Sequence, residues 1–92
     1  MAPSNGNRVR VEVIGIMGAG KCSSDLHEVG QAWVVADAVV PQGMCSYAFN
    51  AINPFITALR FGGRFPWKDD PVATVCCPDA DNPVVFRLSL EE

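Results

Sequence analysis

Residues 45–63 read CSYAFNAINPFITALRFGG, and no other long stretch of the chain has the spacing of an amphipathic helix. Its apolar side chains recur at steps of three and four residues, which places them along one side of a helix. These side chains are Ala48, Phe49, Ile52, Phe55, Ile56 and Leu59. Gly62 and Gly63 predict the helix end. Pro54 removes a backbone donor and clashes with the preceding turn, so we expect a kink or a break into two short helices there.

The segments on both sides of this helix have the patterns of β-strands. In residues 8–16, RVRVEVIGI, valines alternate with charged residues, which is typical of a strand with one face in water. Residues 31–40, QAWVVADAVV, predict a second strand that bends near Asp37. After the helix, residues 72–77 and 84–91 flank the turn sequence PDADNP and predict a hairpin.

The order β-β-α-β-β predicts a small α+β domain in which the helix packs on the apolar face of a largely antiparallel sheet. We place this single domain at residues 8–92 and expect residues 1–7, MAPSNGN, to be a disordered tail. Of the 92 residues, 49% are hydrophobic and only 18% are charged. This composition is poor in charge for a monomer's surface, so we expect a homo-oligomer.

Charge and hydropathy exclude several classes of partner. The net charge is −3 and the seven basic residues are scattered along the chain, which argues against nucleic-acid binding. No segment is long enough to span a membrane, and charged residues interrupt the apolar residues near the start, unlike a secretory signal. We therefore expect a cytoplasmic protein with no membrane partner, whose ligand, if any, is a small molecule.

Residues 15–24, GIMGAGKCSS, are close to the phosphate-binding pattern G-x-x-x-x-G-K-[ST], with Cys22 in the Ser/Thr position. A thiol is a poor ligand for magnesium, and Gly30 comes where the phosphate-binding helix should still be running. We therefore expect no nucleotide and interpret the glycines as a turn.

The four cysteines are Cys22, Cys45, Cys76 and Cys77, which in a reducing compartment act as thiols or metal ligands. Their spacing lacks the paired C-x2-C knuckles of common zinc sites. Strand alternation turns Cys77 toward the core and leaves Cys76 on the opposite face. At the predicted helix start, backbone donors and the helix dipole favour a thiolate at Cys45. Free cysteines also commonly fill core space, and that alternative stays open.

His27 is the only histidine and follows Cys22 at C-x4-H spacing. It is a candidate metal ligand or general base, or equally a surface residue beside Asp25 and Glu28. Asp79 and Asp81 lie in the predicted hairpin turn and are interpreted as turn residues.

The stretches GKCSSDLHEVGQAW, PQGMCSYAFNAINPFITALRFGG and CPDADNPVVFRL together resemble a family of small bacterial and archaeal proteins of unknown function. That family has a cysteine before a glycine-initiated strand, a P-x-G-x-C-x-x-A segment opening a helix that ends in Gly-Gly, and a C-x-D hairpin followed by P-V-x-F. The resemblance places its three cysteines on Cys22, Cys45 and Cys77, with Cys76 as an extra, and implies that the three act together.

Three functions fit these residues. In the first, Cys22, Cys45 and Cys77, with His27 or water as a fourth ligand, bind a transition-metal ion such as zinc, iron or copper, which acts on a small molecule. In the second, Cys45 is the nucleophile or acid/base of a metal-free isomerase or thiol-transfer enzyme, and Cys22 or His27 takes the partner proton. In the third, the protein is a non-enzymatic oligomeric binding or accessory subunit whose cysteines only pack.

Overall fold

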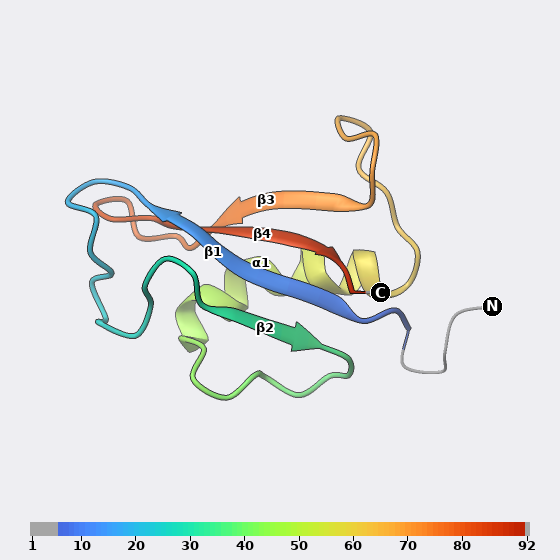
Figure 1. The fold of residues 1–92 in the computed structure, drawn as a ribbon, viewed down its shortest axis with the longest axis horizontal. Helices are drawn as coiled ribbons and strands as arrows, with labels where there is room; N and C mark the ends of the chain where they lie inside the picture. Colours follow the sequence, from blue (N-terminus) through green and yellow to red (C-terminus); the bar gives the residue numbers. More distant parts are fainter. Residues whose placement is uncertain (1–5, 92) are drawn as a thin grey trace.

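A four-stranded antiparallel sheet carries one helix on one of its faces (Figure 1). The structure is a computed structural model that describes residues 6–91. Its elements are β1 (Val9–Ile16), β2 (Ala32–Val35), α1 (Ser46–Arg60), β3 (Val72–Cys76) and β4 (Val84–Leu90), and the strand order is β2-β1-β4-β3. The α+β fold predicted from the sequence is confirmed.

The core lies between α1 and the face of the sheet that β1 and β4 dominate. The valines of β1 at positions 9, 11 and 13 are at most 1% exposed, as the alternation predicts. They meet Phe86 and Leu88 of β4 and Ile52 and Ile56 of α1, all fully buried. On the other face of β1, Arg10 and Glu12 form an ion pair at 3.7 Å.

Helix α1 runs through Pro54 as a single helix, so of the two outcomes expected there, a kink or a break, the break into two short helices is wrong. Pro54 is exposed, so its ring lies on the side of the helix that faces away from the core. The backbone hydrogen bond that proline cannot donate is therefore missing on that side. The helix ends as predicted: Gly62 has φ +83°, its N–H donates to the carbonyl of Leu59 at 3.3 Å, and the N–H of Gly63 donates to that of Ala58 at 2.7 Å. This is a Schellman motif.

Strand β2 is shorter than the predicted strand over residues 31–40. It stops at Val35, and Asp37 then accepts a hydrogen bond from the N–H of Val39 at 2.9 Å. This Asx turn bends the chain at the predicted place but also ends the strand. Val39 and Val40 beyond it are 70% and 49% exposed, so their β-propensity is not used in the sheet.

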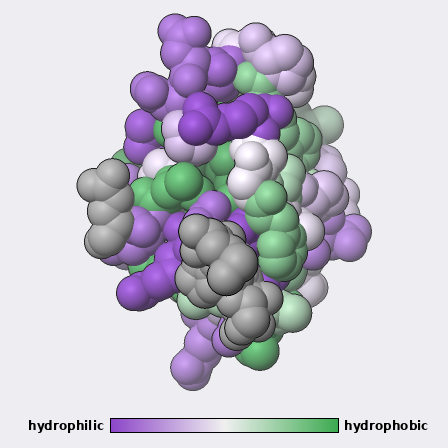
Figure 2. All heavy atoms as spheres, turned by 90° about the vertical axis from the view of Figure 1, so that its right-hand side faces the viewer, coloured by the Kyte–Doolittle hydropathy of each residue, from purple (hydrophilic) through white to green (hydrophobic). Residues whose placement is uncertain are grey.

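Residues 1–5 of the predicted tail lie outside the described residues. Asn7 is described, and it contacts the end of α1: its N–H donates to the carbonyl of Arg60 at 2.6 Å and its side chain donates to that of Leu59 at 3.3 Å. Figure 2 shows the end of the molecule where the loop after α1 and the last residues of β4 lie, and its hydrophobic groups are interspersed with hydrophilic ones. Within residues 6–91, no helix is long and apolar enough to cross a membrane.

Candidate functional site

One cavity of about 300 Å³ is lined by all four candidate site residues, namely Cys22, His27, Cys45 and Cys77. Cys22 and His27 come from the loop after β1, Cys45 directly precedes α1, and Cys77 directly follows β3. The cavity is also lined by Ser23, Ser24, Tyr47, Ala48, Asp79 and Asn82. Three segments that are far apart in the sequence therefore meet at one end of the sheet, and each contributes at least one cysteine.

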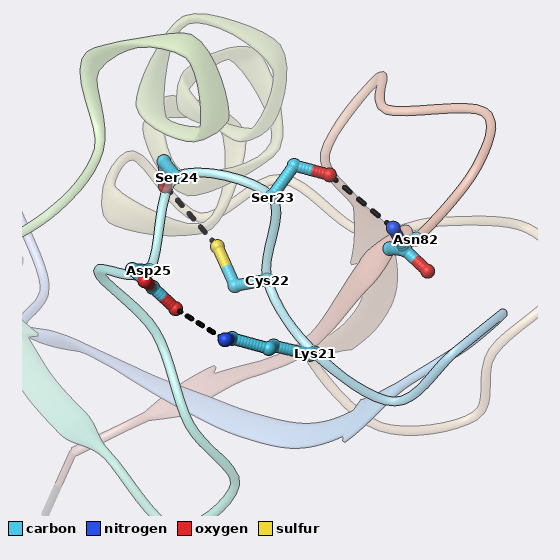
Figure 3. A network of polar contacts seen from close by, with 6 residues as sticks. All are labelled: Lys21, Cys22, Ser23, Ser24, Asp25 and Asn82. Atoms are coloured by element: carbon cyan, nitrogen blue, oxygen red, sulfur yellow. Dashed lines mark hydrogen bonds and ion pairs between the residues drawn. The ribbon is translucent and has the colours of Figure 1, made fainter.

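Cys22 is 7% exposed, and a tight turn wraps its sulfur. The turn is closed by a hydrogen bond from the N–H of Asp25 to the Cys22 carbonyl at 3.0 Å, and Asp25 takes the left-handed conformation with φ +62°. The Sγ atom of Cys22 lies 3.1 Å from the hydroxyl of Ser24 (Figure 3).

The donors around this sulfur favour the thiolate. Burial raises the pKa of Cys22, but the Ser24 hydroxyl and the backbone N–H groups of His27, Ser24 and Leu26 outweigh it, so the pKa lies below its ordinary value. A thiolate is the nucleophilic and metal-binding form of cysteine. Cys22 therefore has the local environment of a reactive cysteine.

His27 is 6% exposed, and both of its ring nitrogens have partners. Nε2 accepts a hydrogen bond from the backbone N–H of Cys45 at 3.1 Å, which fixes the neutral tautomer with its proton on Nδ1. Nδ1 then donates to Oε1 of Gln31 at 3.0 Å. The ring packs edge-on against Trp33 and Phe86, with centroids 5.4 and 5.7 Å away. To bind a metal, Nε2 would have to release the Cys45 N–H.

Cys45 is the N-cap residue of α1, and its side chain makes no capping hydrogen bond. The N–H groups at the start of a helix have no acceptor within the helix, and here the first turn contains no acidic residue. Because Cys45, Tyr47 and Ala48 line the cavity, the positive end of the helix dipole lies beside it. This end of α1 favours negative charge in the cavity.

Cys77 is turned inward and is 7% exposed, whereas Cys76 is exposed, as strand alternation predicts. Its Sγ accepts a hydrogen bond from the N–H of Val84 at 3.3 Å, while its own N–H donates to the Val84 carbonyl at 3.0 Å. The Cys77 sulfur thus lies at the closing pair of the β3–β4 hairpin and is fixed by the backbone.

A polar wall of the cavity is formed by Ser23, Asp79 and Asn82, none of which was a candidate site residue in the sequence analysis, where only Asp79 was named, as a turn residue. The Ser23 hydroxyl donates a hydrogen bond to Oδ2 of Asp79, and Nδ2 of Asn82 donates to the Ser23 hydroxyl oxygen at 3.3 Å. The Ser23 hydroxyl and the N–H of Asp81 hold the pKa of Asp79 below its usual value. Asp79 does act as a turn residue, because its Oδ1 accepts the N–H of Asp81 at 3.0 Å, but it also bonds across to the loop. Local sequence carries no signal for that second contact, since Ser23 and Asp79 are 56 positions apart.

The glycine-rich segment forms a turn rather than the start of a helix. Residues 17–31 contain no helix, and the Lys21 ammonium pairs with the Asp25 carboxylate at 3.5 Å on the surface. Gly18 has φ +70°, and a Cβ atom there would lie 1.9 Å from the carbonyl oxygen of Asp81. Gly18 therefore allows the loop to lie directly against the β3–β4 hairpin, which is the physical reason for glycine at this position.

Among the residues that the structure describes, no three His, Cys, Asp or Glu side chains form a group that could hold a metal ion. All four cysteines are free thiols. In comparisons with known proteins, no family model, no curated protein and no solved structure matches the chain.

Proposed function

We propose that the cavity is a cysteine-dependent site for a small molecule, and that Cys22 is its reactive thiolate. The observation that carries this proposal is the place of Cys22, which lines the cavity with its sulfur 3.1 Å from the Ser24 hydroxyl. The lowered pKa of this thiol agrees with that placement. Reactive cysteines in proteins typically have such lowered pKa values and access to a ligand cavity. The metal-free alternative from the sequence thus gains support, with Cys22 rather than Cys45 as the nucleophile.

The chemistry assigned to the site is nucleophilic attack. The Cys22 sulfur forms a bond to an electrophilic carbon or sulfur of the bound molecule, and the leaving group departs with the electron pair of the bond that breaks. Cys45 and Cys77 provide two further thiols in the same cavity. The N-terminus of α1 stabilises negative charge that develops on the substrate.

His27 is given a positioning role in this proposal. Its Nε2 holds the backbone of Cys45, and its ring packs against the core, so the loop that carries Cys22 is tied to the start of α1. A general base would need a ring nitrogen directed at the substrate, and both nitrogens of His27 are engaged with protein groups.

The pH dependence of alkylation tests this function. The protein is treated with a small excess of iodoacetamide between pH 5 and pH 10, and mass spectrometry follows each cysteine separately. We expect Cys22 to reach half of its maximal rate below the ordinary thiol value of about 8.5, and the exposed Cys76 serves as the internal control. A Cys22 that titrates together with Cys76 would contradict the proposal.

Binding of a soft metal ion is a second candidate, favoured by the three cysteines around one cavity. The Cys77 sulfur accepts an N–H hydrogen bond, and the Cys22 sulfur lies 3.1 Å from the Ser24 hydroxyl; hydrogen bonds of this kind commonly support thiolate ligands of metals. Zinc, iron and copper are the metals that such ligands suit. The side chains would have to move closer together to share an ion.

Elemental analysis of the native protein, together with a count of accessible thiols, separates the two candidates. A metal site predicts a stoichiometric ion that disappears in Cys22→Ser and Cys77→Ser but stays in Cys76→Ser, since Cys76 lies on the other face of the sheet. If the purified protein contains no metal and all of its cysteines react with a thiol reagent, metal binding is excluded and only the nucleophilic function remains.

A further inference from the structure

We propose that Ser23, Asp79 and Asn82 are positioning residues that hold the Cys22 turn against the β3–β4 hairpin and thereby keep the donors around the Cys22 sulfur in place. We call these three residues the loop clamp. This role rests on the proposed function of Cys22, because the loop clamp acts by positioning the turn that carries the Cys22 sulfur.

The clamp joins two segments that are distant in sequence. Asp79 accepts a hydrogen bond from the Ser23 hydroxyl. Asn82 donates to the Ser23 hydroxyl oxygen at 3.3 Å (Figure 3). The Oδ1 atom of the same Asn82 accepts the backbone N–H of Ala19 at 2.8 Å. Three hydrogen bonds therefore attach the loop at both Ala19 and Ser23.

The hairpin side of the clamp is itself fixed. Oδ1 of Asp79 accepts the N–H groups of Asp81 and Asn82 at 3.0 and 3.4 Å, which leaves Oδ2 for Ser23. The Ser23 hydroxyl, the largest influence, lowers the pKa of Asp79 below its already acidic usual value. The Asp79 carboxylate is thus charged throughout the pH range in which a thiol titrates, and the clamp does not itself titrate there.

Backbone contact supports the same attachment. Gly18 approaches the hairpin so closely that only glycine fits, because a Cβ atom would meet the Asp81 carbonyl oxygen and the Asn82 side chain. The N–H of Met17 also donates to the carbonyl of Pro83 at 2.9 Å. Met17 and Gly18, in the segment before Cys22, therefore pack directly against the β3–β4 hairpin turn.

Ser23 directly follows Cys22 in the turn that is closed by the hydrogen bond from the Asp25 N–H to the Cys22 carbonyl. Holding Ser23 against the hairpin therefore also holds Cys22. The N–H donors to the sulfur belong to Ser24, Leu26 and His27, directly after the clamped residue. If the clamp is lost, the turn can open and these donors separate from the sulfur, so the pKa of Cys22 moves up toward its ordinary value.

The test measures Cys22 alkylation against pH in Asp79→Ala and Ser23→Ala, with Asp81→Ala as the charge-matched control. Asp81 is exposed and lies in the same turn, and it bonds to Asp79 through its backbone N–H and not through its carboxylate. We expect the two clamp variants to lower the rate at pH 7 several-fold, because a smaller fraction of Cys22 is then ionised at that pH. Asp81→Ala should leave it unchanged, and the double variant Ser23→Ala/Asp79→Ala should add little to either single change, because both remove the same bond.

A measurement above the titration separates positioning from access. At pH 10, above the ordinary thiol value of about 8.5, Cys22 is mostly ionised in every variant, so the clamp variants should alkylate at least as fast as wild type, whereas blocked access would keep them slower. Alkylation of the buried Cys77, followed in the same spectra, reports general unfolding. Clamp variants that alkylate like wild type at pH 7, while wild-type Cys22 titrates below an ordinary thiol, would overturn the clamp alone. A wild-type Cys22 that titrates as an ordinary thiol would overturn the proposed function and the clamp together.

Discussion

The backbone N–H of Cys45 donates a hydrogen bond to Nε2 of His27 at 3.1 Å, so a side chain from the loop after β1 binds the N-cap residue of the only helix in the described part of the chain. The opposite nitrogen of the ring is held by Gln31, four residues further along. The bond to Cys45 joins the two segments that carry Cys22 and Cys45, and the bond to Gln31 orients the ring within the loop. Their relative position in the cavity therefore depends on His27.

Replacing His27 with alanine should destabilise the protein by about 1–3 kcal/mol, because the change removes a buried hydrogen-bond acceptor and leaves a cavity beside Phe86. Urea unfolding followed by circular dichroism measures this loss. Glu28→Ala, at the exposed neighbouring position, should change stability by no more than about 0.5 kcal/mol. Equal stability of His27→Ala and Glu28→Ala would contradict the assigned role.

Gly18→Ala should destabilise the protein more than Gly20→Ala. Both glycines have positive φ, +70° and +78°, so each substitution pays about 1 kcal/mol or more for a left-handed alanine. Only at Gly18 does the added Cβ meet another atom, the Asp81 carbonyl oxygen at 1.9 Å; at Gly20 nothing lies within 4 Å. The difference between the two free energies of unfolding isolates the contact between loop and hairpin. Equal losses would mean that the loop can move away from the hairpin at no energetic cost.

Local periodicity and turn residues were sufficient to predict the α+β class, but not the strand order. The alternation in residues 8–16 and the three- and four-residue spacing in residues 45–63 each report on burial along a single element, and both elements form as predicted. The same reasoning failed beyond Val35, because a single Asx turn at Asp37 outweighs the strand propensity of Val39 and Val40. The inward direction of Cys77 was predictable for the same reason as the strands.

The site was predictable only in part. A lone histidine at C-x4-H spacing says nothing about which groups occupy its nitrogens, and the Cys45 N–H is 18 positions away. The link from Ser23 to Asp79 joins residues that no local pattern connects, so the clamp became visible only when the loop and the hairpin were placed in space. The only local hint for His27 is Gln31, one helical turn's spacing away but in a loop.

Cys76 and Cys77 should differ sharply although they are neighbours. Cys77→Ser places a more polar, smaller group in a buried position, and we expect a loss of about 1–2 kcal/mol. Cys76→Ser changes an exposed side chain and should stay within about 0.5 kcal/mol of wild type. Urea unfolding under reducing conditions measures both. A larger loss at Cys76 would mean that the two strand faces are exchanged.

The stability of the protein should rise with pH through the range in which Cys22 titrates. Burial raises the pKa of Cys22, but the Ser24 hydroxyl and three backbone N–H groups hold it below the ordinary value, so the folded state loses this proton at a lower pH than the unfolded chain does. The unfolded state then binds more protons in the interval between the two pKa values, and the free energy of unfolding increases with pH there. This contribution is fully present above the ordinary thiol value of about 8.5 and is lost as the pH falls through the folded value. The difference in free energy of unfolding between wild type and Cys22→Ser, measured from pH 5 to pH 9.5, cancels the other titrating groups. A difference that stays flat or falls as the pH rises would show that the folded state does not favour the Cys22 thiolate.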